Sequence, residues 1–338
     1  MEKNVADNLL TLVDQYNKHF PTSFKKLDNM EKYSDDEDIF VSDRHYEKFM
    51  SFDESTTKVD LDIEVLKKYI AHTTNSLYSW KWHKKIYEID SELSDLLLEQ
   101  YIGDMQIESD IIRKLPFSGM CLHMNNYEDI FAIARIDYFK GDTKALYFTI
   151  FYNETVNEAD EQDRITVPIV RIIPLIEGLT VAQCAQRVKY KLDSAEDEEN
   201  ARLFSIQLLN ILMYILSASA DVKKSITIPT LNIDRHRKKY KRVLEELEVF
   251  EVGFVIGETI RMHKNTNTSS NNKRKIDPFE TRTGSTAFKC PHVRCGHWQH
   301  YWVGKRGCQT RILKWVHPCL VNTLTKESIN VCVNPVKI

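Results

Sequence analysis

Glycine is scarce in this chain, and no glycine-rich phosphate-binding loop occurs in it. Only 10 of its 338 residues are glycine, and neither the P-loop pattern nor the dinucleotide-binding fingerprint is present. These absences argue against a nucleotide-binding α/β enzyme. The most apolar segment, 203–216, is interrupted by Gln207 and Asn210, so it falls short of the roughly 20 apolar residues that span a membrane. We expect a buried helix there, no membrane association and no cofactor.

Acidic residues are missing from one long stretch near the C-terminal end. Residues 281–326 contain eight Lys or Arg and no Asp or Glu, which leaves 38 basic against 49 acidic residues in the rest of the chain. A protein of net charge −3 therefore combines a strongly basic segment with an acidic body. This asymmetry favours an anionic partner for the basic segment, with nucleic acid as the leading candidate.

The chain also lacks the features of a secreted protein. Residues 1–15 contain scattered acids and no apolar core, so we expect no secretory signal. The seven cysteines are an odd number. We therefore expect reduced thiols and a cytoplasmic protein.

Hydrophobic periodicity predicts an α+β protein with four regions. These are a helical N-terminal region at 1–110, an antiparallel sheet covered by helices at 111–263, a flexible polar linker at 264–284, and a basic, aromatic, β-rich module at 285–338. Within the first region, helices are expected at 8–20, 61–70 and 77–101. In the second, we expect a hairpin of 131–138 and 145–152, a strand at 165–173, helices at 180–192, 201–218 and 235–248, and a strand at 251–260.

The C-terminal module contains three of the five tryptophans. Residues 296–304 are too aromatic and β-rich for a helix, and 311–316 can return as a second strand. Alternation would place Trp298, His300 and Trp302 on one face of the first strand. Gly296 and Gly304 are expected to set its ends, because glycine permits close approach and positive φ.

Aromatic planes beside cations suit unpaired bases and phosphates, although the same composition fits a structural hairpin with solvated arginines. The candidate nucleic-acid or partner contacts are the aromatic and basic residues Arg294, His297, Trp298, Tyr301, Trp302, Lys305, Arg306, Arg311, Lys314 and Trp315. The basic run 235–242 is either a solvated helix face or a second contact of this kind.

Two chemical alternatives involve the same module. A metal-independent ribonuclease would use His292, His297 or His300 as acid or base, whereas the carboxylates that hold magnesium are missing. A zinc site could include Cys290 and Cys295, but their spacing is C-x4-C and not the C-x2-C of a typical zinc knuckle.

The order of residues in the module resembles the C-terminal signature of a phage-borne anti-CRISPR family. That family is the second one named for inhibitors of the type V-A CRISPR nuclease, and its signature is approximately PHIRRGHWHxYWxG…RW..P..VN. The matching stretches are Pro291–Arg294, Gly296–Trp298, Tyr301–Trp302 and Gly304, followed by Lys314–Trp315, Pro318 and Val321–Asn322. Looser similarity extends upstream, at 77–80, 86–87, 180–182 and 208–216.

The resemblance implies a protein that acts in the cytoplasm of a bacterial host cell and lowers the abundance of the effector nuclease. Members of the family recognise the effector's nascent N-terminal peptide during translation and trigger loss of its mRNA. The implied partners are therefore the nascent effector polypeptide and the mRNA or ribosome. A ribonuclease and a direct protein-binding inhibitor of the effector are the alternative functions.

Two departures from the signature matter for the chemistry. Cys295 stands where the signature has a second arginine, which weakens the zinc alternative. Gln299 stands where the signature has a histidine, and a histidine follows at His300. A catalytic role that needs a histidine at position 299 is therefore not expected in this chain.

Overall fold

The computed structural model shows an α+β fold. It describes residues 9–14, 16, 27, 42–43, 63–107, 112, 115, 119–124, 130–152, 168–190, 192, 194–217, 221–232, 243–261, 292–294, 296–305 and 307–321. The helices with assigned labels are α4 (Ile63–His83), α5 (Ser91–Glu99), α7 (Val181–Ala185) and α8 (Ala195–Leu216). Residues 9–14 and 254–261 are also helical.

The centre of the fold is a seven-stranded mixed sheet with the strand order β5-β4-β3-β2-β1-β7-β6. Its strands are β1 (Lys85–Ile89), β2 (Met120–Met124), β3 (Ile130–Tyr138), β4 (Lys144–Phe151), β5 (Ile169–Pro174), β6 (Val222–Asn232) and β7 (Val243–Val252). β1 runs parallel to both of its neighbours, β2 and β7, and the remaining pairs are antiparallel. The predicted α+β class is confirmed.

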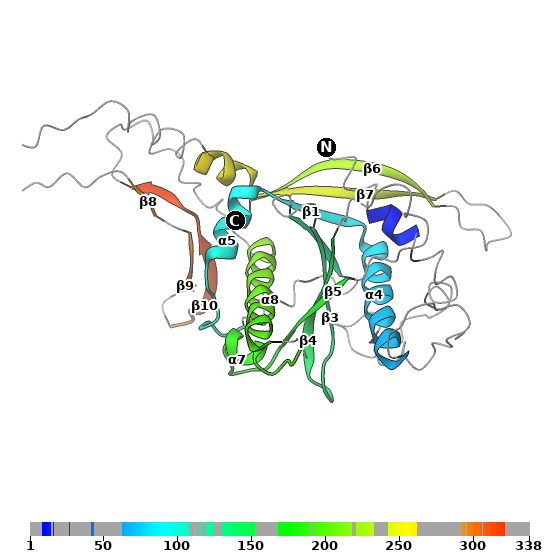
Figure 1. The fold of residues 1–338 in the computed structure, drawn as a ribbon. Coiled ribbons are helices and arrows are strands. Elements are labelled where there is room, and N and C mark those ends of the chain that lie inside the picture. Colours follow the sequence, from blue (N-terminus) through cyan, green and yellow to red (C-terminus); the bar gives the residue numbers. More distant parts are fainter. Residues whose placement is uncertain are drawn as a thin grey trace, which may run out of the picture.

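Helices cover both faces of this sheet (Figure 1). α5, α7 and α8 pack on one face, where alternate strand residues such as Leu122 and Phe148 join one buried apolar cluster. α4 and the helical residues 9–14 lie on the other face, where Cys121 and Ile133 join a second cluster. Because successive side chains of a strand point to opposite faces, β2, β3 and β4 contribute to both clusters and are apolar almost throughout.

The predicted hairpin is confirmed, since β3 and β4 pair from Phe131 with Phe151 to Tyr138 with Lys144. Thr180 caps α7 as part of a capping box with Gln183, but α7 ends at Ala185 and does not continue to 192. The chain then leads to Tyr190, whose hydroxyl bonds both the N–H (3.1 Å) and the C=O (3.2 Å) of Ile172 on β5. Tyr190 thereby satisfies backbone groups on the outer edge of the sheet.

The prediction of one long helix at 77–101 is wrong at residues 85–89, which form a strand. α4 ends at His83, and β1 separates it from α5. Lys84 adopts φ 49° and donates its N–H to Trp80 O at 2.7 Å, which closes the helix in the left-handed conformation that glycine usually provides. β1 gains backbone pairing on both sides, and that pairing outweighs the helical spacing of its apolar residues.

Two predictions near residue 250 are also wrong. A helix at 235–248 does not fit the structure, because Val243–Val252 is the strand β7; residues 235–242 lie outside the described residues. The strand predicted at 251–260 ends at Val252, and residues 254–261 are helical. Gly253 makes the transition at φ 75°. The helical residues 254–261 lie close to Asp90, the N-cap of α5. A Cβ on Gly257 would lie 1.7 Å from Asp90 Oδ1.

α8 is the buried apolar helix expected at 201–218, and it begins earlier, at Ala195. Ser194 caps it, and three acids follow in its first turn, where they complement the helix dipole. Among the described residues, no helix is long and apolar enough to cross a membrane. The predicted linker at 264–284 lies outside the described residues.

Candidate functional site

The basic aromatic module contains an antiparallel hairpin, as predicted. β9 (His297–Val303) pairs with β10 (Thr310–Val316), and a shorter pair joins β8 (His292–Arg294) to β11 (Cys319–Val321). Gly304, at φ 118°, ends β9, and the turn is closed by a 2.9 Å hydrogen bond from Cys308 N–H to Lys305 O. We call β9, β10 and this turn the aromatic hairpin. It lies beside α8 on the side away from the sheet (Figure 1).

The base of the aromatic hairpin is part of the protein core. Trp298 and Trp315 are directly opposite each other in the strand register and therefore share a face. Their rings pack edge to face with their centroids 5.4 Å apart. Trp315 makes a second edge-to-face contact with Tyr214 of α8, with the ring centroids 5.9 Å apart. Trp315 is 2% exposed. A Cβ on Gly296 would lie 2.4 Å from Trp315 Cζ2, so glycine is needed there for close approach, as predicted.

Asn210 of α8 joins the aromatic hairpin to α5. Its side-chain oxygen accepts a 2.7 Å hydrogen bond from Trp298 Nε1–H, and its Nδ2 donates a 2.7 Å bond to Leu97 O. Asn210 is fully buried. A buried amide with both ends satisfied fixes the position of the indole, because leaving either partner unpaired would be costly.

The tip of the aromatic hairpin is exposed on both faces. Trp302 is 67% exposed, and its neighbours Tyr301 and Val303 are 39% and 44% exposed. Arg311 is directly opposite Trp302 in the register and is exposed, as is Lys305 in the turn. This combination presents an aromatic plane beside two cations to the solvent, which suits stacking on a base together with contacts to phosphates.

The remaining predicted contacts are distributed more widely. Lys314 and His297 are half-buried, and both belong to the face opposite Trp298. Arg294 and His292 lie on β8, where the structure describes only the backbone. Arg306 lies outside the described residues. The structure thus separates the tip residues Tyr301, Trp302, Lys305 and Arg311 from Trp298 and Trp315, which are packed against the body.

Of the three histidines proposed for acid–base chemistry, the two on β9 do not share a face. His297 and His300 are three residues apart on β9, so their side chains point to opposite sides of the ribbon. A paired acid and base acting on one phosphate would need both on the same side. Cys290 and Cys295 lie outside the described residues. In the part of the chain that is described, no group of three or more His, Cys, Asp or Glu side chains is placed to hold a metal ion.

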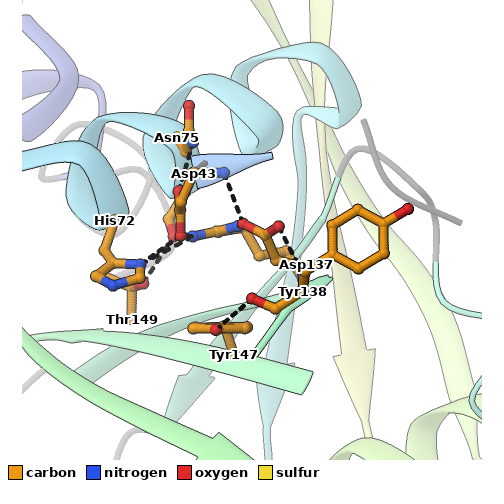
Figure 2. A network of polar contacts seen from close by, with 9 residues as sticks. Asp43, His72, Asn75, Asp137, Tyr138, Tyr147 and Thr149 are labelled. Carbon is orange, nitrogen blue, oxygen red and sulfur yellow. Dashed lines mark hydrogen bonds and ion pairs between the residues drawn. The ribbon is translucent and has the colours of Figure 1, made fainter. Parts of the chain in front are cut away.

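A second polar cluster, on the opposite side of the sheet, was not found from the sequence. Figure 2 shows it. Arg135 of β3, 2% exposed, donates to Asp137 Oδ2 at 2.7 Å and to Asp43 Oδ2 at 2.6 Å. Its Nε also donates to Ser76 Oγ of α4 at 3.0 Å. Asp43 further contacts His72. We call Asp43, His72, Arg135 and Asp137 the buried ionic network.

The charges of the buried ionic network shift one another's pKa values. Burial opposes the ionisation of Asp43, but Arg135 and His72 outweigh it and hold its pKa well below the usual range. Burial raises the pKa of Asp137 to about 6, and the neighbouring charge of Asp43 adds to the rise. Burial alone would lower the pKa of Arg135, yet the two carboxylates raise it above its ordinary value. Arg135 is therefore a permanent cation between two carboxyl groups whose pKa values are shifted in opposite directions.

The contacts of the buried ionic network indicate an anchor and not a reactive site. Asp43 N–H donates to Asp137 Oδ2 at 2.9 Å, and Asn75 Nδ2 bonds Asp43 Oδ1. The Arg135 guanidinium also lies over the ring of Tyr147, 5.1 Å from its centroid. The network therefore ties residue 43 to α4 and β3, which are distant in sequence. One sequence feature could have indicated this network. Arg135 and Asp137 have opposite charges and are two residues apart in an apolar strand, so they share a face.

A family model described as AcrVA2-like, the anti-CRISPR type V subtype A2 family, matches residues 87–323. The matched range begins in β1 and includes the sheet from there on, α8 and the whole aromatic hairpin. No curated protein matches the chain.

Proposed function

Because the chain belongs to the AcrVA2-like family, the anti-CRISPR type V subtype A2 family, we propose that it lowers the level of a type V-A CRISPR effector. The proposed route is recognition of the effector's nascent N-terminal peptide during translation, followed by loss of the effector mRNA. The partners on this route are the nascent polypeptide and the mRNA or ribosome. The protein would act in the cytoplasm of a bacterial host as a regulator and not as a nuclease.

The observation that carries the proposal is the exposed tip of the aromatic hairpin within the family match. Trp302 and Arg311 are adjacent across the strands and exposed, and residues 281–326 contain no acid. A protein that acts on a message under translation needs a surface for RNA, and a cationic surface with an exposed aromatic plane meets that need. The acidic remainder of the chain would provide the surface that selects the peptide.

The proposal is tested with effector genes whose first codons differ. In one gene, synonymous codons change the RNA and keep the N-terminal peptide; in a second, missense codons change the peptide. Each gene is expressed with and without the protein, and effector mRNA and effector protein are quantified. We expect loss of the message from the wild-type and synonymous genes and none from the missense gene.

Two results would contradict the proposal. If the synonymous gene escapes and the missense gene does not, the signal is the RNA sequence and not the peptide. If effector mRNA and protein stay constant while interference is lost, the protein is a direct inhibitor of the effector. A gene for an unrelated protein, carrying the effector's N-terminal codons as a fusion, serves as the matched gain-of-function control and is expected to become sensitive.

A further inference from the structure

We infer that the tip of the aromatic hairpin is a binding site for unpaired RNA bases, in which Trp302 is the stacking surface and Arg311 and Lys305 contact phosphates. The inference rests on the proposed function, because a function directed at a message supplies RNA as the partner. It goes further by naming single-stranded RNA and the residues that bind it.

The exposure of Trp302 has no structural explanation within the aromatic hairpin. Strand alternation places Trp302 on the same face as Trp298, and Trp298 packs against the core and bonds Asn210. Trp302 extends this packing face beyond the base and stays 67% exposed. An indole is among the largest apolar side chains, and burying it is favourable. A flat aromatic surface left open at this place is available to a planar ligand.

The charges around Trp302 favour a polyanion. Arg311 occupies the position directly opposite on the partner strand, so its guanidinium can approach the same ligand from the side. Lys305 follows in the turn, and no acid occurs anywhere in 281–326 to compete for these cations. Aromatic stacking between cations is how sequence-tolerant proteins bind single strands, since every base has a π-face and every nucleotide a phosphate.

A lipid surface fits the geometry less well than RNA. An element that lies on a bilayer buries a broad apolar face between the headgroups and the acyl chains. Here the apex is polar, with Gly304, Lys305, Gly307 and Gln309, and the aromatic residues lie in the strand behind it. The exposed Tyr301 and Trp302 are adjacent in β9 and lie on opposite faces, so neither face offers a broad apolar surface to a bilayer, whereas one exposed indole is enough to stack on a base. Duplex RNA would engage only the cations, because its bases are stacked on one another and hidden.

The test uses the full-length protein and fluorescently labelled oligouridylate of about 16 nucleotides, within the span that single-strand binders cover. The comparison ligand is the same strand annealed to oligoadenylate. We expect the single strand to bind more tightly than the duplex. Trp302→Ala should weaken single-strand binding about tenfold or more, because stacking contributes strongly to each bound base. It should change duplex binding less than about twofold, and Trp302→Phe should keep most of the affinity.

Substitutions of Arg311 and of a control lysine distinguish a specific phosphate contact from a general effect of positive charge. Arg311→Ala should lower the slope of log affinity against log salt by about 0.7, the value for one phosphate contact on a single strand. Lys223→Ala removes an exposed cation of β6 and should leave affinity and slope unchanged. Trp302 is exposed, so unaltered thermal unfolding of Trp302→Ala confirms that the variant is folded.

Three results would overturn the inference. These are equal affinity for single strand and duplex, single-strand binding that survives Trp302→Ala, and binding of anionic phospholipid vesicles without binding of RNA. None of them bears on whether effector mRNA falls in cells, which is decided by the recoded effector genes. Conversely, a protein that binds single strands through Trp302 but leaves effector mRNA intact would contradict the proposed function alone.

Discussion

Trp298 of the aromatic hairpin and Asn210 of α8 are joined by a 2.7 Å hydrogen bond from the indole N–H to the amide oxygen. The same amide donates to Leu97 O of α5, so one buried side chain holds three elements together. The base of the hairpin is thereby fixed to the body while its tip, with Trp302, stays exposed. Substitutions at the base should therefore lower stability, whereas substitutions at the tip should affect function alone.

Removing the amide of Asn210 should destabilise the protein and loosen the hairpin. Asn210→Ala leaves Leu97 O and the Trp298 N–H without their partner, and it opens a cavity beside α8. We expect the free energy of unfolding to fall by about 2–4 kcal/mol, measured by urea denaturation. Trp298→Phe, which removes the N–H but keeps an aromatic ring, should cost less, about 1–2 kcal/mol. An Asn210→Ala variant as stable as wild type would show that this bond is dispensable.

Trp315 and Trp302 should behave oppositely when each is replaced by alanine. Trp315 is 2% exposed, so Trp315→Ala should lower the free energy of unfolding by about 3–5 kcal/mol. Trp302→Ala should stay within about 0.5 kcal/mol of wild type, as an exposed substitution does, yet lose effector silencing in cells. Urea denaturation and effector immunoblots on the same two variants check this. Equal destabilisation by both would mean that Trp302 is also a packing residue.

Arg135 should be the most costly charge to remove. Arg135→Met leaves Asp43 and Asp137 buried beside each other without a cation, and breaking a buried ionic network in this way costs about 3–5 kcal/mol. Arg202→Met is the control, because Arg202 is only partly buried and pairs within α8 with Glu198 and with the exposed Glu199, so its loss should cost about 1 kcal/mol. Thermal and chemical unfolding of the two variants gives the comparison. A loss for Arg135→Met no larger than for Arg202→Met would contradict the anchoring role.

The raised pKa of Asp137 should appear in the pH dependence of stability. Its pKa rises from an ordinary value of 3.8 to about 6 on folding, so between these values the native state binds more protons than the unfolded state. The contribution of Asp137 to the free energy of unfolding therefore falls as pH rises through that window. Asp43, with a lowered pKa, contributes stability that is lost as pH falls below 3.8.

Asp137→Asn cannot ionise and should lack this decline. The stability of the variant relative to wild type should therefore increase from pH 4 to pH 7, whatever its absolute value. Asp104→Asn, at an exposed site, is the control and should show no such trend. Urea midpoints measured across this range test the sign, and a difference between Asp137→Asn and wild type that is independent of pH would refute it.

Local patterns predicted the hairpins but not the centre of the sheet. β3, β4, β9 and β10 follow from β-rich runs separated by turn residues, because each pairs with its neighbour in sequence. β1 does not, since its partners β2 and β7 are distant in the chain. The helix before it ends at Lys84, which adopts a positive φ with none of the glycine signal that normally marks such an end. Long-range pairing decided the structure of 85–89, and no local pattern reports it.

The candidate site was predicted in part for the same reason. Alternation along β9 placed Trp298 and Trp302 on one face, but only α8 determines which of them is covered. Arg135 and Asp137 could have been recognised as a same-face pair of opposite charges in an apolar strand. Asp43 could not, because it comes from a segment 92 residues away.

We propose that this anti-CRISPR protein acts on the effector message through the exposed tip of the aromatic hairpin. The most direct measurement is the half-life of effector mRNA after transcription is stopped, in cells with wild-type protein or the Trp302→Ala/Arg311→Ala double variant at equal abundance. We predict rapid decay with wild type, and decay with the double variant as slow as without the protein. Rapid decay with the double variant would contradict the claim.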